Sequence, residues 1–349
     1  MGSQLPCRVT WLLEFSGAPQ LEQAWLDYRA ARTYLGSDAA VLGINALANA
    51  TVLLRLRMLA DLPLSSRIGL VLNLLLSIAH AALVRSAPQP YKRWRTVLVS
   101  CARLLRMAVV LSLCGITSSS SSSSTALTGG WVGMVLQLLL LSPASASFLC
   151  AVALPLPLRS HAALQVLLTG LALSRAPALC AQVVNGAGTA RCGELQLLSH
   201  RLRWLNPFAT RVLPWVPPDG PGCCVSTLSA IMVAHGIVLS SVAVYTVDLI
   251  SRTRFLRRES GLPSESVTGL IRVMRTVWLV GCVTALSSLP VVWELCLLAQ
   301  KLGEVGLAGY GVAGIGALLT SLLLESFMRV WLALVLLLLS SVLFVMLGD

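Results

Sequence analysis

Long apolar stretches alternate with short polar ones from about residue 39 to the end of the chain. Roughly 20 apolar residues in a helix cross the bilayer core of about 30 Å, so each stretch predicts a transmembrane helix. The candidate spans are 39–54, 68–84, 97–116, 131–154, 161–184, 225–250, 277–298, 306–324 and 330–347. The span 39–54 is the weakest, because it is short and contains Asn45 and Asn49. We therefore expect an all-α, polytopic integral membrane helix bundle with seven to nine transmembrane helices.

The segment 1–38 has a different pattern. Between residues 20 and 35, apolar side chains such as Trp25 and Tyr28 recur at helical spacing, and charged side chains occupy the rest of the helix surface. A helix of this kind lies either on the membrane surface or against the helix bundle. We therefore divide the chain into an N-terminal interfacial segment, 1–38, and a transmembrane domain, 39–349.

Composition supports the membrane interpretation and excludes two other classes of protein. Of the 349 residues, 56% are hydrophobic and 11% are charged, whereas a soluble domain has about 25% charged residues. These proportions exclude a soluble globular enzyme, and they also exclude a disordered chain, which requires low hydrophobicity. The sequence contains no nucleophile elbow, zinc-protease motif or phosphate-binding loop. We therefore expect no catalytic residues, cofactor or metal.

The basic residues predict contact with anionic lipid rather than nucleic acid. The net charge of +12 is distributed between the apolar stretches and is not concentrated on one long face. The densest group is Arg252, Arg254, Arg257 and Arg258, which we expect to bind lipid headgroups at about 1 kcal/mol per residue. The alternative is that these arginines only fix the orientation of the chain.

The distribution of charge also predicts that orientation. Cytosolic loops of membrane proteins carry an excess of lysine and arginine. The connection 251–276 contains six arginines, whereas the connection 117–130, which includes the serine run 118–124, contains no lysine or arginine. We therefore place 251–276 in the cytosol and 117–130 on the other side. The C-terminus then lies on the non-cytosolic side.

Three residues inside the predicted spans are candidates for interior polar groups. Arg103 and Arg106 lie in the span 97–116, where two central arginines cost about 5 to 7 kcal/mol. Arg106 would lie about 13 Å from the inner end of the span, so we expect it to face the bundle interior or a wet cavity. Alternatively, the span boundary is shifted and both arginines lie at the inner interface. His235, in the middle of the span 225–250, is either a proton relay or a packing residue.

Small residues mark a further candidate region. Gly306, Gly309, Ala313 and Gly316 lie on one helical face, an arrangement that permits either close helix packing or a hinge. Pro290 predicts a kink in the span 277–298.

The connection 185–224 contains Cys192, Cys223 and Cys224. On an oxidising side of the membrane, Cys192 can form a disulfide with one of the other two; the alternative is three free thiols. Cys180 lies inside an apolar stretch, where cysteine is expected to act as a small hydrophobic residue.

Three functions fit these features. The number of spans, the Pro290 kink and the interior candidates Arg106 and His235 favour a transporter-like or channel-like protein for a small solute. A receptor with a ligand surface at 185–224 is the second alternative. A structural or assembly protein without a solute path is the third.

Overall fold

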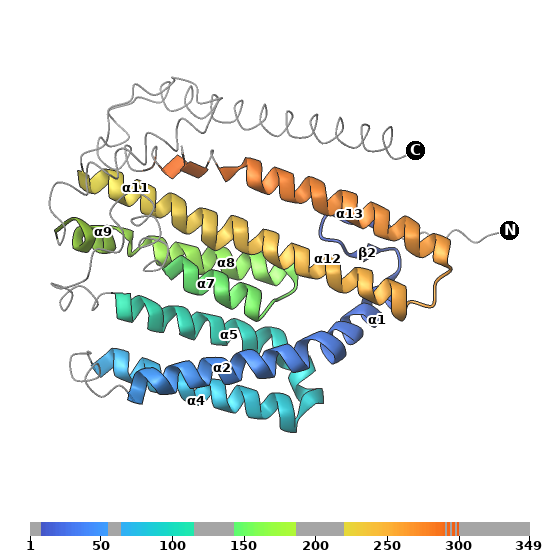
Figure 1. The fold of residues 1–349 in the computed structure, drawn as a ribbon, viewed down its shortest axis with the longest axis horizontal. Coiled ribbons are helices and arrows are strands. Elements are labelled where there is room, and N and C mark those ends of the chain that lie inside the picture. The colour runs from blue at the N-terminus through green and yellow to red at the C-terminus, as the bar shows by residue number, and fades with distance from the viewer. Residues whose placement is uncertain are drawn as a thin grey trace, which may run out of the picture. The chain divides into compact units, whose positions relative to one another are not determined.

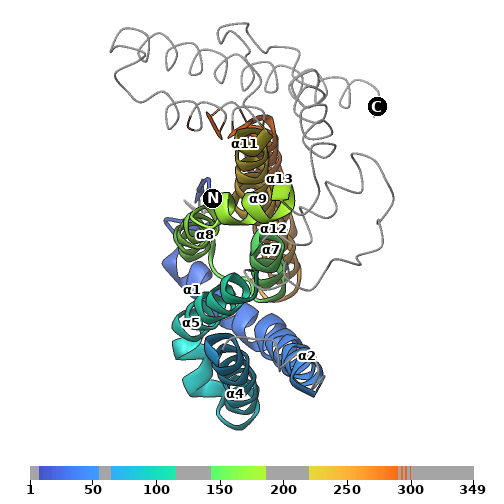
Figure 2. The same ribbon diagram turned by 90° about the vertical axis from the view of Figure 1, so that its left-hand side faces the viewer.

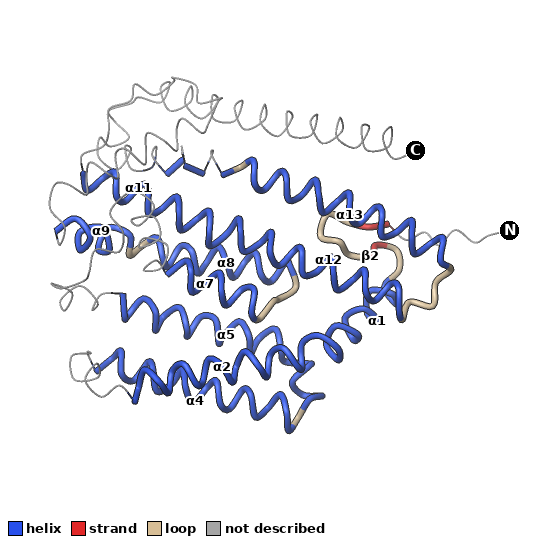
Figure 3. Tube along the Cα trace, viewed as in Figure 1, coloured by secondary structure: helices blue, strands red, loops and turns tan. Residues whose placement is uncertain are grey.

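The computed structural model describes residues 8–54, 64–114, 143–185 and 220–289, together with positions 292, 293, 295, 296 and 299. Helices make up almost all of this part of the chain (Figures 1 and 3). The exception is a small antiparallel ladder between β1 (Arg8–Val9) and β2 (Phe15–Ser16). The predicted α-helical class is therefore confirmed.

The N-terminal helices follow one another with little interruption. They are α1 (Pro19–Arg29), the π-helical turn η1 (Ala30–Tyr34), α2 (Leu35–Leu54), α4 (Leu64–Ser86) and α5 (Pro88–Cys114). Both α1 and α5 begin at a proline, which is favoured in the first turn because its missing N–H has no partner there in any case. The helices α2, α4 and α5 lie side by side (Figures 1 and 2).

The remaining helices follow from residue 143 onward. They are α7 (Pro143–Ala153), α8 (Leu158–Leu173), α9 (Ala176–Asn185), α11 (Gly220–Val233), the π-helical η2 (Ala234–Leu239), α12 (Ser240–Arg258) and α13 (Ser264–Ser287). Between α12 and α13 the chain turns at Gly261, whose φ of 65° is a conformation that favours glycine.

Three helices within the described residues are long and apolar enough to cross a membrane: Ser66–Ser86, Cys224–Arg258 and Ser264–Ser287. The first two contain the predicted spans 68–84 and 225–250. They support a membrane protein, while the count of seven to nine spans stays a prediction.

Two predicted boundaries need correction. The helix α13 begins at Ser264 rather than at 277, so Arg272 and Arg275 belong to a helix and not to a connecting loop. The predicted span 161–184 is divided by a turn at Ser174 and Arg175.

The chain forms two compact units. The first comprises Met1–Leu113, Ala146–Leu168 and Ser240–Gly281, and the second comprises Cys114–Ser145, Thr169–Leu239 and Cys282–Asp349. We describe each unit separately.

The helix α4, in the first unit, has its polar side buried and its apolar side exposed. Its buried positions follow a heptad spacing and include four polar residues: Ser66, Leu70, Asn73, Ser77, His80 and Val84. On the opposite face Leu72, Leu75 and Ile78 are 49%, 56% and 51% exposed. A helix on a water-facing surface shows the reverse arrangement, whereas polar side chains within a membrane face the bundle interior. The pattern of α4 therefore suits a lipid environment.

A disulfide joins two helices of the second unit and corrects one prediction. Cys224, at the start of α11, is bonded to Cys180 of α9, with 5.7 Å between their Cα atoms. The sequence left open a disulfide from Cys192 to Cys223 or Cys224 or three free thiols, and it predicted Cys180 to act as a small hydrophobic residue; Cys192 itself lies outside the described residues. Cys180 is the partner of Cys224 because α9 and α11 pack together, which brings the two side chains into contact.

Loss of this disulfide should destabilise the second unit. The bond closes a loop with a sequence separation of 44 residues, for which chain entropy predicts a stabilisation of about 4 kcal/mol. We expect Cys180→Ser and Cys224→Ser to lower the apparent melting temperature of the detergent-solubilised protein equally, and the double variant to add nothing further. The control is Cys101→Ser, which removes an exposed free thiol. An equal loss in the control, or additive effects of the two variants, would contradict the pairing.

Candidate functional site

A ladder of amide and hydroxyl groups joins α2 to α4 in the first unit. Asn45 Nδ2 donates to Ser77 Oγ at 2.6 Å, and Asn73 Nδ2 donates to Asn49 Oδ1 at 3.1 Å. The Ser77 hydroxyl donates in turn to the Asn73 carbonyl at 2.7 Å. Hydrogen bonds of this kind hold helices together in lipid, where the hydrophobic effect provides no attraction between them.

An ion pair between α2 and α5 lies beside this ladder. Arg95 donates to both carboxylate oxygens of Asp38, at 2.7 and 3.0 Å, and Tyr91 donates its hydroxyl to Asp38 at 2.5 Å. A further N–H of Arg95 donates to the Pro155 carbonyl at 2.8 Å. Arg95 and Asp38 are 4% and 0% exposed. The buried charges are therefore fully paired, as burial of a charge requires.

A second ion-pair cluster joins α1 to α12. Arg29 pairs with Asp248, and Arg252 pairs with Asp248 at 3.1 Å and with both oxygens of Glu22 at 2.7 Å. The guanidinium carbon of Arg252 lies 3.6 Å from the ring centroid of Trp25, a cation–π contact. Two arginines thus face two carboxylates, and this cluster fixes α1 against α12.

Tyr34 lies between the two ion-pair clusters. Its ring centroid is 3.2 Å from the guanidinium carbon of Arg95 and 4.7 Å from that of Arg29. Burial, opposed by the charges of Arg29 and Arg95, raises the pKa of Tyr34 above its usual value. The phenol is therefore neutral, and its π-face is available to both cations.

The pairing of Arg252 corrects the expectation for that residue. We expected it to bind headgroups together with Arg254, Arg257 and Arg258, but Arg252 is only 2% exposed and its guanidinium is occupied by Glu22 and Asp248. Arg254, Arg257 and Arg258 are exposed on α12. Headgroup contact therefore remains a prediction for these three alone.

Arg103 caps the end of a neighbouring helix. It donates to the carbonyls of Ala151 and Leu154, at and just after the C-terminus of α7, and to His161 Nδ1 at 3.3 Å. Because Nδ1 accepts this bond, the neutral imidazole carries its proton on Nε2, which lies 3.4 Å from Ser241 Oγ. The last carbonyls of a helix lack intrahelical partners. Arg103 provides a hydrogen-bond donor to two carbonyls at the end of α7.

Arg106 forms no ion pair with a carboxylate in the part of the chain that the structure describes, unlike Arg29, Arg95 and Arg252. It is 7% exposed, yet its Nε and Nη2 have no hydrogen-bond partner among the described residues. The same holds for Asn73 Oδ1 and His80 Nε2 on α4, whose residues are 5% and 4% exposed. We call Asn73, His80 and Arg106 the polar cluster. Most buried polar atoms have a partner, so these four atoms are candidates to bind a water, an ion or a solute. Other buried atoms, such as Nε and Nη2 of Arg29, are also without a hydrogen-bond partner among the described residues.

The packing of α4 against α5 brings Asn73 and Arg106 to the same level. Ser66 donates to the Ser112 carbonyl at 3.4 Å, and Gly69 lies against Val109. These contacts define an antiparallel register in which position 73 lies opposite 105–106. His80 lies two turns further along the same buried face of α4.

His235, the third interior candidate, belongs to the second unit, whereas Arg103 and Arg106 belong to the first. It lies half-buried in the π-helical segment η2. Next to it, a Cβ atom on Gly236 would approach Thr169 Oγ1 to 2.7 Å, so glycine is required for this close packing.

The other predicted site residues lie outside the described part of the chain. They are Gly306, Gly309, Ala313, Gly316, Pro290 and Cys192, together with the side chain of Cys223.

Sequence reasoning missed most partners of the buried arginines. Asp38, Glu22 and Asp248 look like ordinary helix-end carboxylates in the sequence. A usable signal was present in α4, where polar residues recur at 66, 73, 77 and 80 on one heptad face. Such a stripe within an apolar helix predicts a polar seam between helices.

Comparison with known proteins finds no matching protein-family model, no matching curated protein and no matching solved structure. Among the described residues no three histidine, cysteine, aspartate or glutamate side chains gather where they could hold a metal ion.

The Asp38–Arg95 pair should contribute far more to stability than the surface pair Glu14–Arg159. Asp38→Asn leaves Arg95 buried without its counter-charge, which should cost about 3 to 5 kcal/mol. Glu14→Gln removes a pair whose side chains are 32% and 72% exposed, which should cost at most about 1 kcal/mol. Denaturant unfolding in detergent micelles measures both. Equal losses would show that the buried pair is not a structural element.

Proposed function

We propose that the chain is a multi-pass membrane protein with transporter-like or channel-like activity, and that its solute is a small anion. The observation that carries this proposal is the burial of Arg106 with two N–H-bearing nitrogens unpartnered among the described residues. A charged side chain inside a membrane protein is costly and commonly marks a substrate or ion pathway. The polar cluster of Asn73, His80 and Arg106 is the corresponding site.

The charge balance of the first unit supports an anion. Among its described residues the buried arginines are Arg29, Arg95, Arg103, Arg106 and Arg252, and the carboxylates that pair with them are Glu22, Asp38 and Asp248. The excess positive charge rests on Arg103 and Arg106. Backbone carbonyls solvate Arg103, so Arg106 is the guanidinium left to attract a solute.

The disulfide supports the proposed orientation. Disulfides persist in oxidising compartments and are rare in the cytosol, so the Cys180–Cys224 bond suits a non-cytosolic position for the ends of α9 and α11. The helix Cys224–Arg258 carries Arg254, Arg257 and Arg258 at its other end. If the Cys224 end is non-cytosolic, this basic end faces the cytosol, as the excess of arginine there favours. The same orientation places the C-terminus on the non-cytosolic side.

A structural or assembly role is the second candidate. It is favoured by Arg95 and Arg103, which bind backbone carbonyls between Ala151 and Pro155 and so hold the α7–α8 turn against α5. Under this alternative Arg106 contributes only to packing, and its charge can be removed without loss of any flux.

Neutralising Arg106 should abolish most of the transport. We expect purified wild-type protein in proteoliposomes to take up at least one of three radiolabelled anions, namely chloride, phosphate and succinate. Arg106→Gln should reduce that uptake at least about tenfold at low tracer concentration, because it removes a charge-assisted hydrogen bond. Arg106→Lys retains the charge and should retain part of the uptake.

The matched control is Arg93→Gln, which removes an exposed arginine from the same helix. It should leave uptake within twofold of wild type. Gel filtration in detergent checks that each variant is folded. Uptake of all three anions no greater than in protein-free vesicles, or equal uptake by Arg106→Gln and wild type, would refute the proposal.

A further inference from the structure

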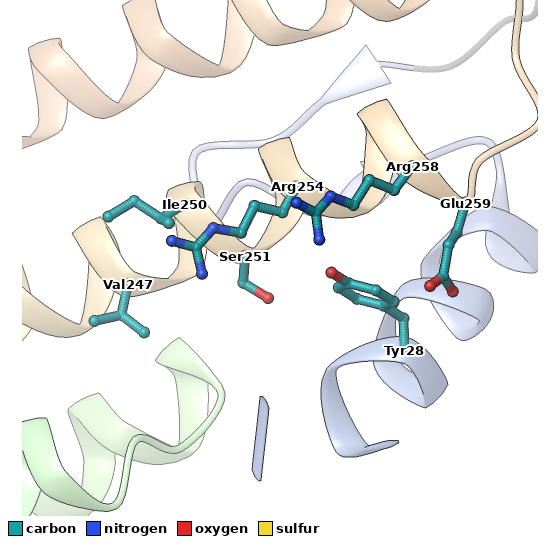
Figure 4. Close-up of a pocket in the computed structure, with 7 residues that line it drawn as sticks. All are labelled: Tyr28, Val247, Ile250, Ser251, Arg254, Arg258 and Glu259. Carbon is teal, nitrogen blue, oxygen red and sulfur yellow. The ribbon is translucent and has the colours of Figure 1, made fainter. Parts of the chain in front are cut away.

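A pocket of about 590 Å³ lies between α1 and the C-terminal half of α12, within the first unit (Figure 4). Its lining residues are Tyr28, Val247, Ile250, Ser251, Arg254, Arg258 and Glu259. It is separate from the polar cluster, and what it binds does not depend on the proposed transport activity.

Ser251 has a buried hydroxyl that forms no hydrogen bond with the described residues. Elsewhere in α12 and just after it, Thr246 donates to the carbonyl of residue 242 at 2.8 Å and Ser260 to that of residue 256 at 2.6 Å. Ser251 is 6% exposed, and its Oγ has no hydrogen-bond partner among the described residues. Its hydroxyl points into the pocket (Figure 4).

Two guanidinium groups and a phenol surround the same space. Arg254 and Arg258 lie one helical turn apart, and neither forms an ion pair with a carboxylate in the described part of the chain. Like charges at this spacing repel each other, and a bound anion would relieve that repulsion. The Tyr28 hydroxyl is directed toward the space between Ser251 and Arg258 (Figure 4), and its ring rests against Phe255 with centroids 5.5 Å apart.

We propose that this pocket binds a phosphate monoester. A phosphate monoester has a charge near −2 at neutral pH and three terminal acceptor oxygens. Arginine matches phosphate oxygens with its planar donor fork, and the hydroxyls of Ser251 and Tyr28 supply two further donors. The monoester is either the headgroup of a lipid such as phosphatidate or a soluble phosphate.

The position of the pocket along α12 suits a lipid headgroup. The helix Cys224–Arg258 has 35 residues, a length of about 52 Å, whereas the hydrocarbon core is about 30 Å thick. Its charged C-terminal part therefore extends beyond the hydrocarbon, and residues 247–259 reach the level of the headgroups.

Glu259 gives the pocket an opposing charge. It lies at the opposite end of the lining from Arg254 (Figure 4), and it reduces the net charge of the lining to +1. Glu259→Gln should therefore tighten binding of the anion.

Calorimetric titration of the full-length protein in detergent tests the site. The probes are dioctanoyl phosphatidate, glycerol 3-phosphate and, as a diester control, dioctanoyl phosphatidylglycerol. We expect phosphatidate to bind, and the double variant Arg254→Gln/Arg258→Gln to weaken its binding at least about tenfold. Arg93→Gln removes one arginine charge from an exposed residue of α5 that does not line the pocket, and it should change the affinity less than twofold.

The outcomes separate the two sources of the phosphate. Binding of phosphatidate but not glycerol 3-phosphate assigns the pocket to a lipid, and equal binding of the two assigns it to a soluble ligand. If the double arginine variant does not fold, Ser251→Ala and Tyr28→Phe, which keep the charge, should each weaken binding at least threefold. The proposal is overturned by no binding of either monoester, by equally tight binding of the diester, by an equal loss in Arg93→Gln, or by unchanged affinity in both hydroxyl variants.

Discussion

The structure depends on one constraint: inside a lipid bilayer a polar group has no water to bond, so it must find its partner within the protein. The helix α4 shows the consequence most clearly, with Asn73, Ser77 and His80 buried while Leu72 and Ile78 on the other side are exposed. Its neighbours follow the same rule. Helices that offer polar side chains to one another and apolar ones to the surroundings are held together by hydrogen bonds and ion pairs rather than by the hydrophobic effect.

The buried arginines divide into two kinds under this constraint. Arg29, Arg95 and Arg252 meet carboxylates, and Arg103 meets backbone carbonyls. These four arginines stabilise the fold. Removing a partner of any of them would leave a buried charge without compensation. Arg106 has neither a carboxylate nor a carbonyl partner among the described residues. For that reason the proposed function rests on Arg106. Stability and function are thus assigned to different arginines.

The sequence predicted those features that depend on local pattern. Apolar runs located the helices around 68–84 and 225–250. For Arg106 the sequence left two positions open, the bundle interior and the inner interface. Pairings between distant segments were not predictable in this way. Arg252 and Arg254 lie two residues apart on α12. Arg252 is buried because it pairs with Asp248, one turn away, and with Glu22, which is 230 residues away in the sequence. Likewise, the spacing of cysteines in the sequence does not show that α9 packs against α11. It is this packing that allows Cys180 to form a disulfide with Cys224.

The most direct measurement is the accessibility of α4 in a bilayer. Spin labels placed singly at Leu72, Leu75 and Ile78, which are exposed, can be probed with oxygen, which partitions into lipid, and with a water-soluble nickel chelate. If lipid covers α4, all three labels will collide often with oxygen and rarely with the chelate. Frequent collisions with the chelate at these positions would show that water, not lipid, covers the apolar face, and would contradict a membrane position for α4.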